Sequence, residues 1–113
     1  MEMSKMIINV LGTPYEIHER NIADDVYLKD CDGYCDKTTK TIVVTKKEND
    51  CDLGDFEAYR KKVMRHEIIH AFLFESGLHE CWEHKNGHDE SFVDWIAVQF
   101  PKLMKAFEEA GCM

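Results

Sequence analysis

One long helical pattern changes its character halfway along, and this change constrains the fold more than any other feature. Apolar residues recur every three or four positions over residues 56–76, as on one face of an α-helix. Charged residues fill most other positions as far as Val63, but beyond Met64 the pattern is apolar nearly all round. A helix that is apolar on every side is buried. We therefore expect the rest of the chain to cover the second half of this helix.

Three ionisable residues interrupt this apolar half. The segment "RHEIIH" places His66 and His70 four residues apart, with Glu67 directly after the first. Positions i and i+4 share one helix face, so both imidazoles can reach one zinc ion. Glu67 is turned by about 100° from His66, so its carboxylate can address a water on the metal and not the metal itself. Burying all three without a metal or many hydrogen bonds would be costly, which favours a metal site over a chance spacing.

The third zinc ligand is expected on a second helix. That helix is predicted to begin near Asp89 or Glu90, and Pro101 should kink or restart it. Glu90 and Asp94 fall on an otherwise apolar stripe, which implies a cation opposite them. We predict that Glu90 binds the zinc and that Asp94 accepts the ring N–H of a ligand histidine.

One alternative to Glu90 as the third ligand remains open. Glu90 could simply be an acid favoured at a helix start by the helix dipole. The ligand would then come from one of the histidines between the two helices, namely His79, His84 and His88.

The chain ahead of the first helix has the pattern of a small sheet. Residues 6–12 and 14–19 are β-prone runs around a Gly-Thr-Pro turn and predict a hairpin. The clearest strand is "TIVVT" (Thr41–Thr45), either an edge strand able to pair with an extended peptide or a core strand. The stretch before it is rich in turn residues. We therefore expect a single α+β domain over residues 1–113, with a small antiparallel sheet packed on two main helices.

Charge and cysteine usage limit the partners and the location. The net charge is −8 and no long Lys/Arg cluster is present, which disfavours a nucleic-acid partner. No stretch approaches the ~20 apolar residues of a membrane span, and the N-terminus lacks the pattern of a signal peptide. The five cysteines are irregularly spaced, which indicates free thiols and a cytoplasmic location.

Two cysteines and two tryptophans are expected to be ordinary structural residues. Cys31 and Cys35 are predicted to be thiols on a turn, although an approach of Cys35 to the zinc stays open. Trp82 and Trp95 are predicted to be packing residues and not platforms for a substrate.

Two segments together resemble a known family. "HEIIHAFLFESG", followed about twenty residues later by "ESFVDWIA", resembles the small gluzincin-type zinc metallopeptidases of the ImmA/IrrE family, including short phage or mobile-element members. The resemblance covers residues 65–97 and implies a minimal zincin fold. Val93 and Asp94 stand where the family pattern has Ala and Asn. The implied ligands and base are the residues already singled out: His66, His70, Glu90 and Glu67.

The sequence thus predicts a zinc-dependent metallopeptidase with a peptide or protein substrate. Glu67 would take a proton from a zinc-bound water and pass it to the leaving amine. A further donor to the developing oxyanion is expected from His79, His84, His88 or Tyr34. One alternative is a catalytically silent zinc-binding interaction or regulatory module, against which the presence of Glu67 argues. The other is a hydrolase of a different substrate such as nucleic acid, which the acidic charge disfavours.

Overall fold

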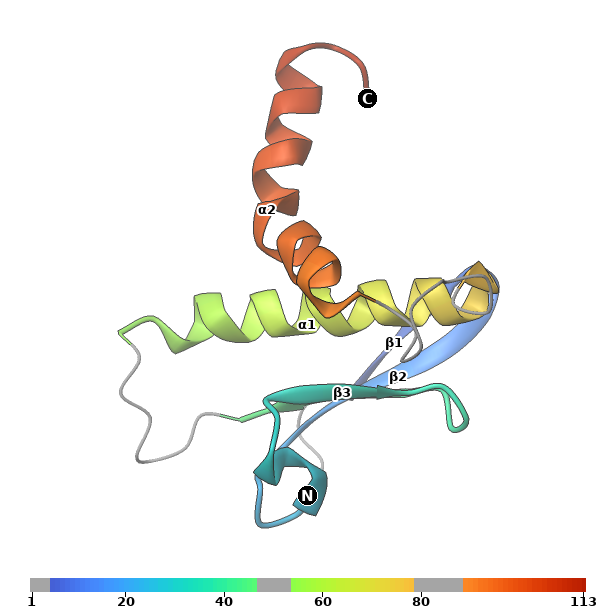
Figure 1. Ribbon diagram of the computed structural model, residues 1–113, viewed down its shortest axis with the longest axis vertical. Helices are drawn as coiled ribbons and strands as arrows, with labels where there is room; N and C mark the ends of the chain where they lie inside the picture. Colours follow the sequence, from blue (N-terminus) through green and yellow to red (C-terminus); the bar gives the residue numbers. More distant parts are fainter. Residues whose placement is uncertain (1–4, 47–53, 79–88) are drawn as a thin grey trace.

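The computed structural model describes residues 5–46, 54–78 and 89–113 (Figure 1). The elements follow the order β1 (Lys5–Val10), β2 (Thr13–Arg20), the 3-10 helix η1 (Val26–Lys29), β3 (Gly33–Asp36), β4 (Thr41–Thr45), α1 (Phe56–Glu75) and α2 (Glu90–Glu109). The expected α+β class, with one small sheet and two main helices, is confirmed. Several residues considered above lie outside the described ranges, namely Trp82, His79, His84 and His88, together with two of the five cysteines, Cys51 and Cys81.

The sheet has the strand order β1-β2-β4-β3 and is mixed, not antiparallel as predicted. β1 and β2 form the predicted antiparallel hairpin, with Leu11 and Gly12 in left-handed conformations at its turn. β3 and β4 are also antiparallel, but β4 runs parallel to β2. The reason lies in the connection after β2: the chain first passes through η1 and β3, so β4 returns beside β2 in the same direction.

The strand β3 was expected to be a turn. Its sequence "GYCD" is typical of turns, and it becomes a strand by pairing with β4, a tertiary effect that local propensity does not report. β4 is one of the two interior strands, with Ile42, Val43 and Val44 fully buried, so "TIVVT" is a core strand and not an edge strand. Gly33 allows α1 to pass closely over β3, since a Cβ there would lie 2.8 Å from Val63 Cγ1.

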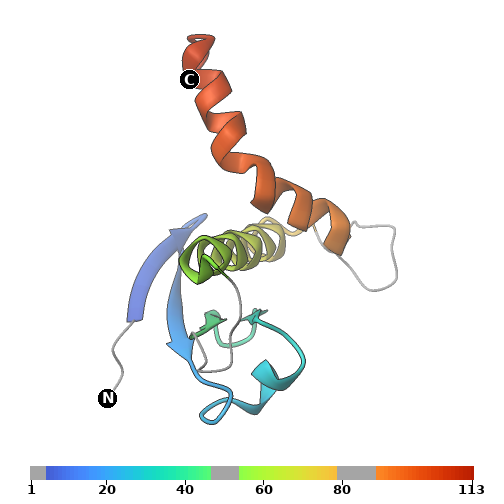
Figure 2. The same ribbon diagram turned by 90° about the vertical axis from the view of Figure 1, so that its left-hand side faces the viewer.

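α1 lies between the sheet and α2, as Figure 2 shows in a view nearly along its axis. Asp55 caps its start by accepting the backbone N–H of Ala58, and Gly77 follows its end with a φ of 80°. Val63 and Ala71 pack into a core supplied by β1, β2 and β4. The second half of α1 was predicted to be covered on every side. It is not, because Phe72 is exposed.

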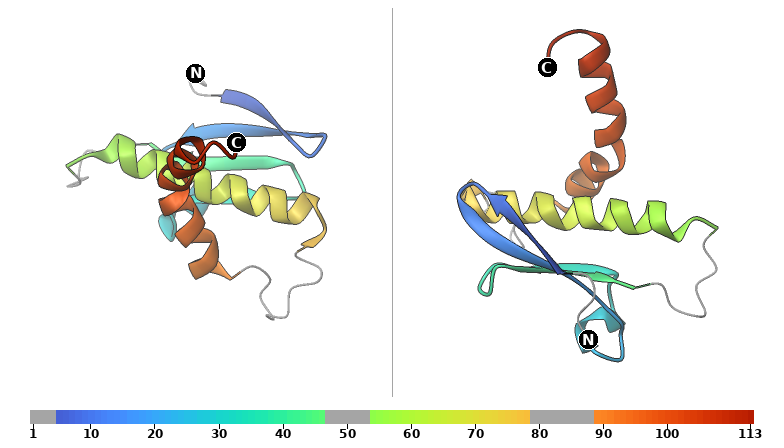
Figure 3. Two further views of the ribbon diagram at one scale, coloured as in Figure 1. Left: turned by 90° about the horizontal axis from the view of Figure 1, so that it is seen from above. Right: turned by 180° about the vertical axis from the view of Figure 1, so that it is seen from behind.

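α2 begins where the sequence indicates, with Asp89 as its cap accepting the N–H groups of Ser91 and Phe92. The helix continues through Pro101, and its two halves point in different directions (Figure 3). The first half crosses α1, while the second half extends away from the rest of the chain (Figure 1). Within the described ranges, no helix is long and apolar enough to cross a membrane.

Candidate metal centre

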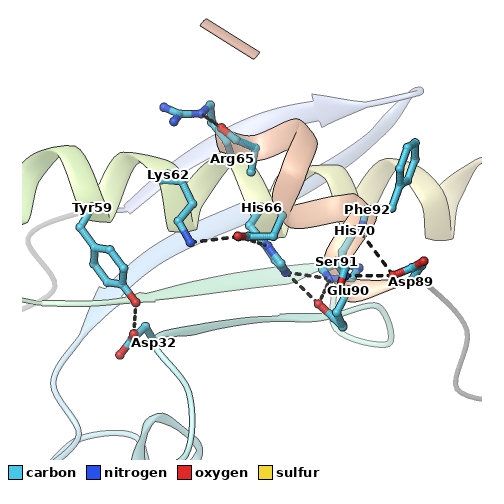
Figure 4. Close-up of polar contacts among 12 residues, drawn as sticks. Asp32, Tyr59, Lys62, Arg65, His66, His70, Asp89, Glu90, Ser91 and Phe92 are labelled. Carbon is cyan, nitrogen blue, oxygen red and sulfur yellow. Dashed lines mark hydrogen bonds and ion pairs between the residues drawn. The ribbon is translucent and has the colours of Figure 1, made fainter. Parts of the chain in front are cut away.

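Donor atoms from α1 and α2 converge at one point beside the crossing of the two helices (Figure 4). Glu90 Oε1 lies 2.9 Å from His66 Nε2 and 3.1 Å from His70 Nε2, and the two histidine nitrogens are 3.2 Å apart. These three side chains form the group of potential metal ligands that the described part of the chain contains. The sequence predicted all three.

The arrangement fits a tetrahedral zinc ion. Two ligand atoms at ~2.1 Å from zinc with a tetrahedral angle between them stand about 3.4 Å apart. The separations of 2.9 to 3.2 Å are within half an ångström of that value, so a small outward movement of each side chain would admit the ion. Two imidazoles and one carboxylate are ordinary zinc ligands, and three protein ligands leave one position open.

Asp94 lies beside His66, within reach of the ring N–H that it was predicted to accept. Its Oδ1 lies 3.1 Å from Nδ1 of His66 and accepts a hydrogen bond of 2.9 Å from Nζ of Lys62. The hydrogen bonds from Lys62 and His66 lower the pKa of Asp94, so its carboxylate is ionised and acts as an acceptor. A hydrogen on Nδ1 leaves Nε2 of a neutral His66 with its lone pair directed at Glu90 and His70.

The charge state of Glu90 also suits a ligand. Burial acts to raise its pKa, but the neighbouring histidines, His70 foremost, outweigh burial and lower the pKa. Burial lowers the pKa of His70, which favours the neutral ring that a metal requires. The site therefore offers an anionic carboxylate and a neutral imidazole to a cation.

Glu67 lies beside the three donor atoms and not among them. It is only 8% exposed, and burial raises its pKa to about 7. Nearby Glu90 raises this pKa further, whereas His66 and Lys62 oppose the shift. Glu67 lines a cavity of about 210 Å³, and the remaining lining residues are Tyr34, Cys35, His66, His70, Phe74 and Glu90.

The edge strand β3 forms one wall of this cavity through Tyr34 and Cys35. Cys35 is therefore a strand residue and not a turn thiol; burial raises its pKa to about 12, so the thiol is neutral. Cys35 does not belong to the three-donor group within the described ranges. The Tyr34 hydroxyl donates a hydrogen bond to Asp25, which directs it away from an oxyanion role in this arrangement.

Trp95 was predicted to be a packing residue, and this prediction is wrong, because 54% of the residue is exposed. It belongs to a second cavity, of about 610 Å³, that also includes His66 and Glu90. The sequence carried a signal for this position: Trp95 is two residues after Val93 and two before Ala97, so it lies off the buried stripe of α2.

Comparison with known proteins gives no match to any protein-family model, curated protein or solved structure. The resemblance to the ImmA/IrrE family therefore stays a prediction, and function must be inferred from the chemistry of the site.

Proposed function

We propose that the protein is a zinc-dependent metallopeptidase. The observation that carries this proposal is the convergence of His66, His70 and Glu90 from two helices, with the buried carboxylate of Glu67 beside them. A purely structural zinc site needs closed coordination and no extra carboxylate, whereas a hydrolytic site needs an open position and a base. The position of Glu67 therefore favours catalysis over the alternative of a silent zinc-binding module.

Each residue of the site has its own role in the proposed reaction. Zinc, when bound by His66, His70 and Glu90, supplies a Lewis acid that polarises a carbonyl and lowers the pKa of water. Glu67 accepts the proton of the attacking water and passes it to the leaving amine. Asp94 holds the ring of His66 in the tautomer that binds metal, and Lys62 in turn holds Asp94.

The edge strand β3 supports a peptide as the substrate. It pairs with β4 on one side, and within the described ranges its other side has no strand partner. An extended peptide that added to this free side would run along Tyr34 and Cys35, which line the cavity holding Glu67. We expected this docking mode for "TIVVT" if it were an edge strand. β3 is an edge strand and β4 is not, so β3 is the candidate for docking.

The proposal also includes a cytoplasmic location. Its support is the odd number of cysteines, of which Cys31, Cys35 and Cys112 are free in the described ranges.

A comparison of wild type with Glu67→Gln tests the proposal. Both proteins, loaded with zinc, are incubated with a proteome-derived peptide library, and cleavage is read by mass spectrometry. The change keeps size and removes the base, so cleavage should fall by a factor on the order of 10² or more. Zinc content and melting temperature should stay nearly unchanged. The control is Glu57→Gln, an exposed acid in the first turn of the same helix, which should cleave like wild type. A Glu67→Gln protein that cleaves as well as wild type would refute the proposal.

A further inference from the structure

A second cavity, lined mainly by α2, adjoins two of the three donor residues, His66 and Glu90. Its volume is about 610 Å³, and it shares His66 and Glu90 with the cavity that holds Glu67. The other lining residues come from the first half of α2, namely Ser91, Asp94, Trp95, Val98 and Gln99. The two cavities therefore have two of the three donor residues in common.

Trp95 and Val98 line this cavity and do not belong to the hydrophobic core. The buried stripe of α2 is formed by Val93 and Ala97, both 0% exposed, whereas Trp95 and Val98 are 54% and 44% exposed. Trp95 is turned about 200° from Val93 around the helix, and Val98 follows Trp95 by one helical turn. Scattered apolar residues are common on surfaces, but these two are neighbours on one helix face and border two metal-binding side chains.

The charges around the cavity favour an uncharged occupant. Asp94 is already paired with Lys62 and His66, and Glu90 faces the two histidines. The remaining polar lining, Ser91 and Gln99, is neutral. A positively charged side chain would therefore find no unpaired carboxylate among these residues, whereas an aromatic ring could pack against the indole of Trp95.

We propose that Trp95 and Val98 form a pocket for a large apolar side chain of the substrate, on the residue next to the cleaved bond. This inference rests on the proposed function, because only a carbonyl held at the donor atoms brings a neighbouring side chain to this cavity. A substrate that enters along β3 places its scissile group at His66 and Glu90, and these residues are the boundary that the two cavities share.

Binding of two hydroxamates tests the pocket without any need for turnover. N-acetyl-phenylalanine hydroxamate and N-acetyl-glycine hydroxamate carry the same metal-binding group and differ in the side chain. Isothermal titration of the zinc-loaded protein should give at least tenfold tighter binding of the phenylalanine compound. In Trp95→Ala this preference should shrink to about twofold or less, while the affinity for the glycine compound stays the same.

Two further variants separate the pocket from general effects on folding. Trp95→Phe keeps an aromatic platform and should retain most of the preference. Phe107→Ala removes a similarly exposed aromatic about 18 Å further along α2 and should leave both affinities unchanged. An equal preference in wild type and Trp95→Ala would overturn the pocket alone. The same holds if a third compound, N-acetyl-lysine hydroxamate, binds more tightly than the phenylalanine compound. If neither hydroxamate binds the zinc-loaded protein, the open metal position fails, and the proposed function fails together with this inference.

Discussion

The side chain of Arg65 donates a hydrogen bond of 2.6 Å from Nε to the backbone carbonyl of Ala97, joining α1 to α2. In an uninterrupted helix, the Ala97 carbonyl would accept the backbone N–H four residues later. That residue is Pro101, which has no N–H. The proline therefore frees an acceptor, and the residue directly before His66 uses it. This contact ties the helix that carries both histidines to the helix that carries Glu90.

Replacing Arg65 by Ala should weaken zinc binding about tenfold. Loss of a hydrogen bond from a charged donor costs about 1.5–3 kcal/mol, and part of this loss should appear as looser positioning of Glu90 against the histidines. The affinity is measured by competition with a chromophoric chelator. Lys61→Ala, an exposed cation on the same helix, is the matched control and should bind zinc like wild type. An unchanged affinity in Arg65→Ala would show that the contact does not position the ligands.

Asp94→Asn should lower zinc affinity by about 10- to 100-fold, the usual effect of losing a carboxylate that orients a ligand histidine. An amide presents its NH₂ group as readily as its oxygen and carries no charge, so it does not fix the tautomer of His66. The same chelator competition measures the loss. Ser91→Ala, on the same helix and beside Glu90, should retain the affinity of wild type. If Asp94→Asn binds zinc as tightly as wild type, His66 is oriented by something else.

Local patterns of the sequence were sufficient for both helices and for the first hairpin. Apolar spacing indicated both helices. An aspartate caps each of them, Asp55 for α1 and Asp89, at the expected start, for α2. β3 and the parallel pairing of β4 with β2 were missed, because both depend on contacts between distant segments. A run such as "GYCD" has no strand pattern of its own. Its strand conformation depends on β4 and on the close passage of α1 over Gly33.

In the candidate site, too, the residues that local patterns indicate were predicted, and the contacts that depend on the tertiary fold were not. His66, Glu67 and His70 follow from spacing within one helix, and Glu90 and Asp94 follow from two acids on an apolar stripe. The structure brings the predicted ligands together. The contacts of Lys62 and Arg65 had no sequence signal of comparable strength. Lysine and arginine are common on helix surfaces, and their partners here become neighbours only when α1 and α2 cross.

Glu75 should make the fold sensitive to acid. It accepts hydrogen bonds from Lys40 at 2.6 Å, Tyr15 at 2.7 Å and Thr13 at 3.1 Å, connecting the end of α1 to the sheet. Lys40 foremost, with Tyr15, lowers the pKa of Glu75 from its ordinary 4.5 to about 2. A pKa that is lower in the folded state means that the ionised group stabilises the fold above about pH 4.5. This contribution is lost progressively as the pH falls towards 2.

The pH dependence of Glu75→Gln measures this contribution. The free energy of unfolding in urea, with EDTA present throughout, should be lower for the variant than for wild type at pH 7. The difference between the two proteins should shrink as the pH falls from 4.5 towards 2. Glu108→Gln, at the exposed end of α2, should show no such trend. A difference that is constant between pH 7 and pH 2.5 would contradict the role of the ionised carboxylate.

Zinc content and affinity, determined for wild type and three ligand variants, test the central claim most directly. Wild type purified without chelators and dialysed against metal-free buffer should hold close to one zinc per chain by elemental analysis. His66→Ala and His70→Ala should nearly abolish binding, and Glu90→Ala should bind far more weakly than wild type, with Ser91→Ala as the unaffected control. A wild-type protein that binds no zinc, or a Glu90→Ala protein that holds it as tightly as wild type, would contradict the proposed centre.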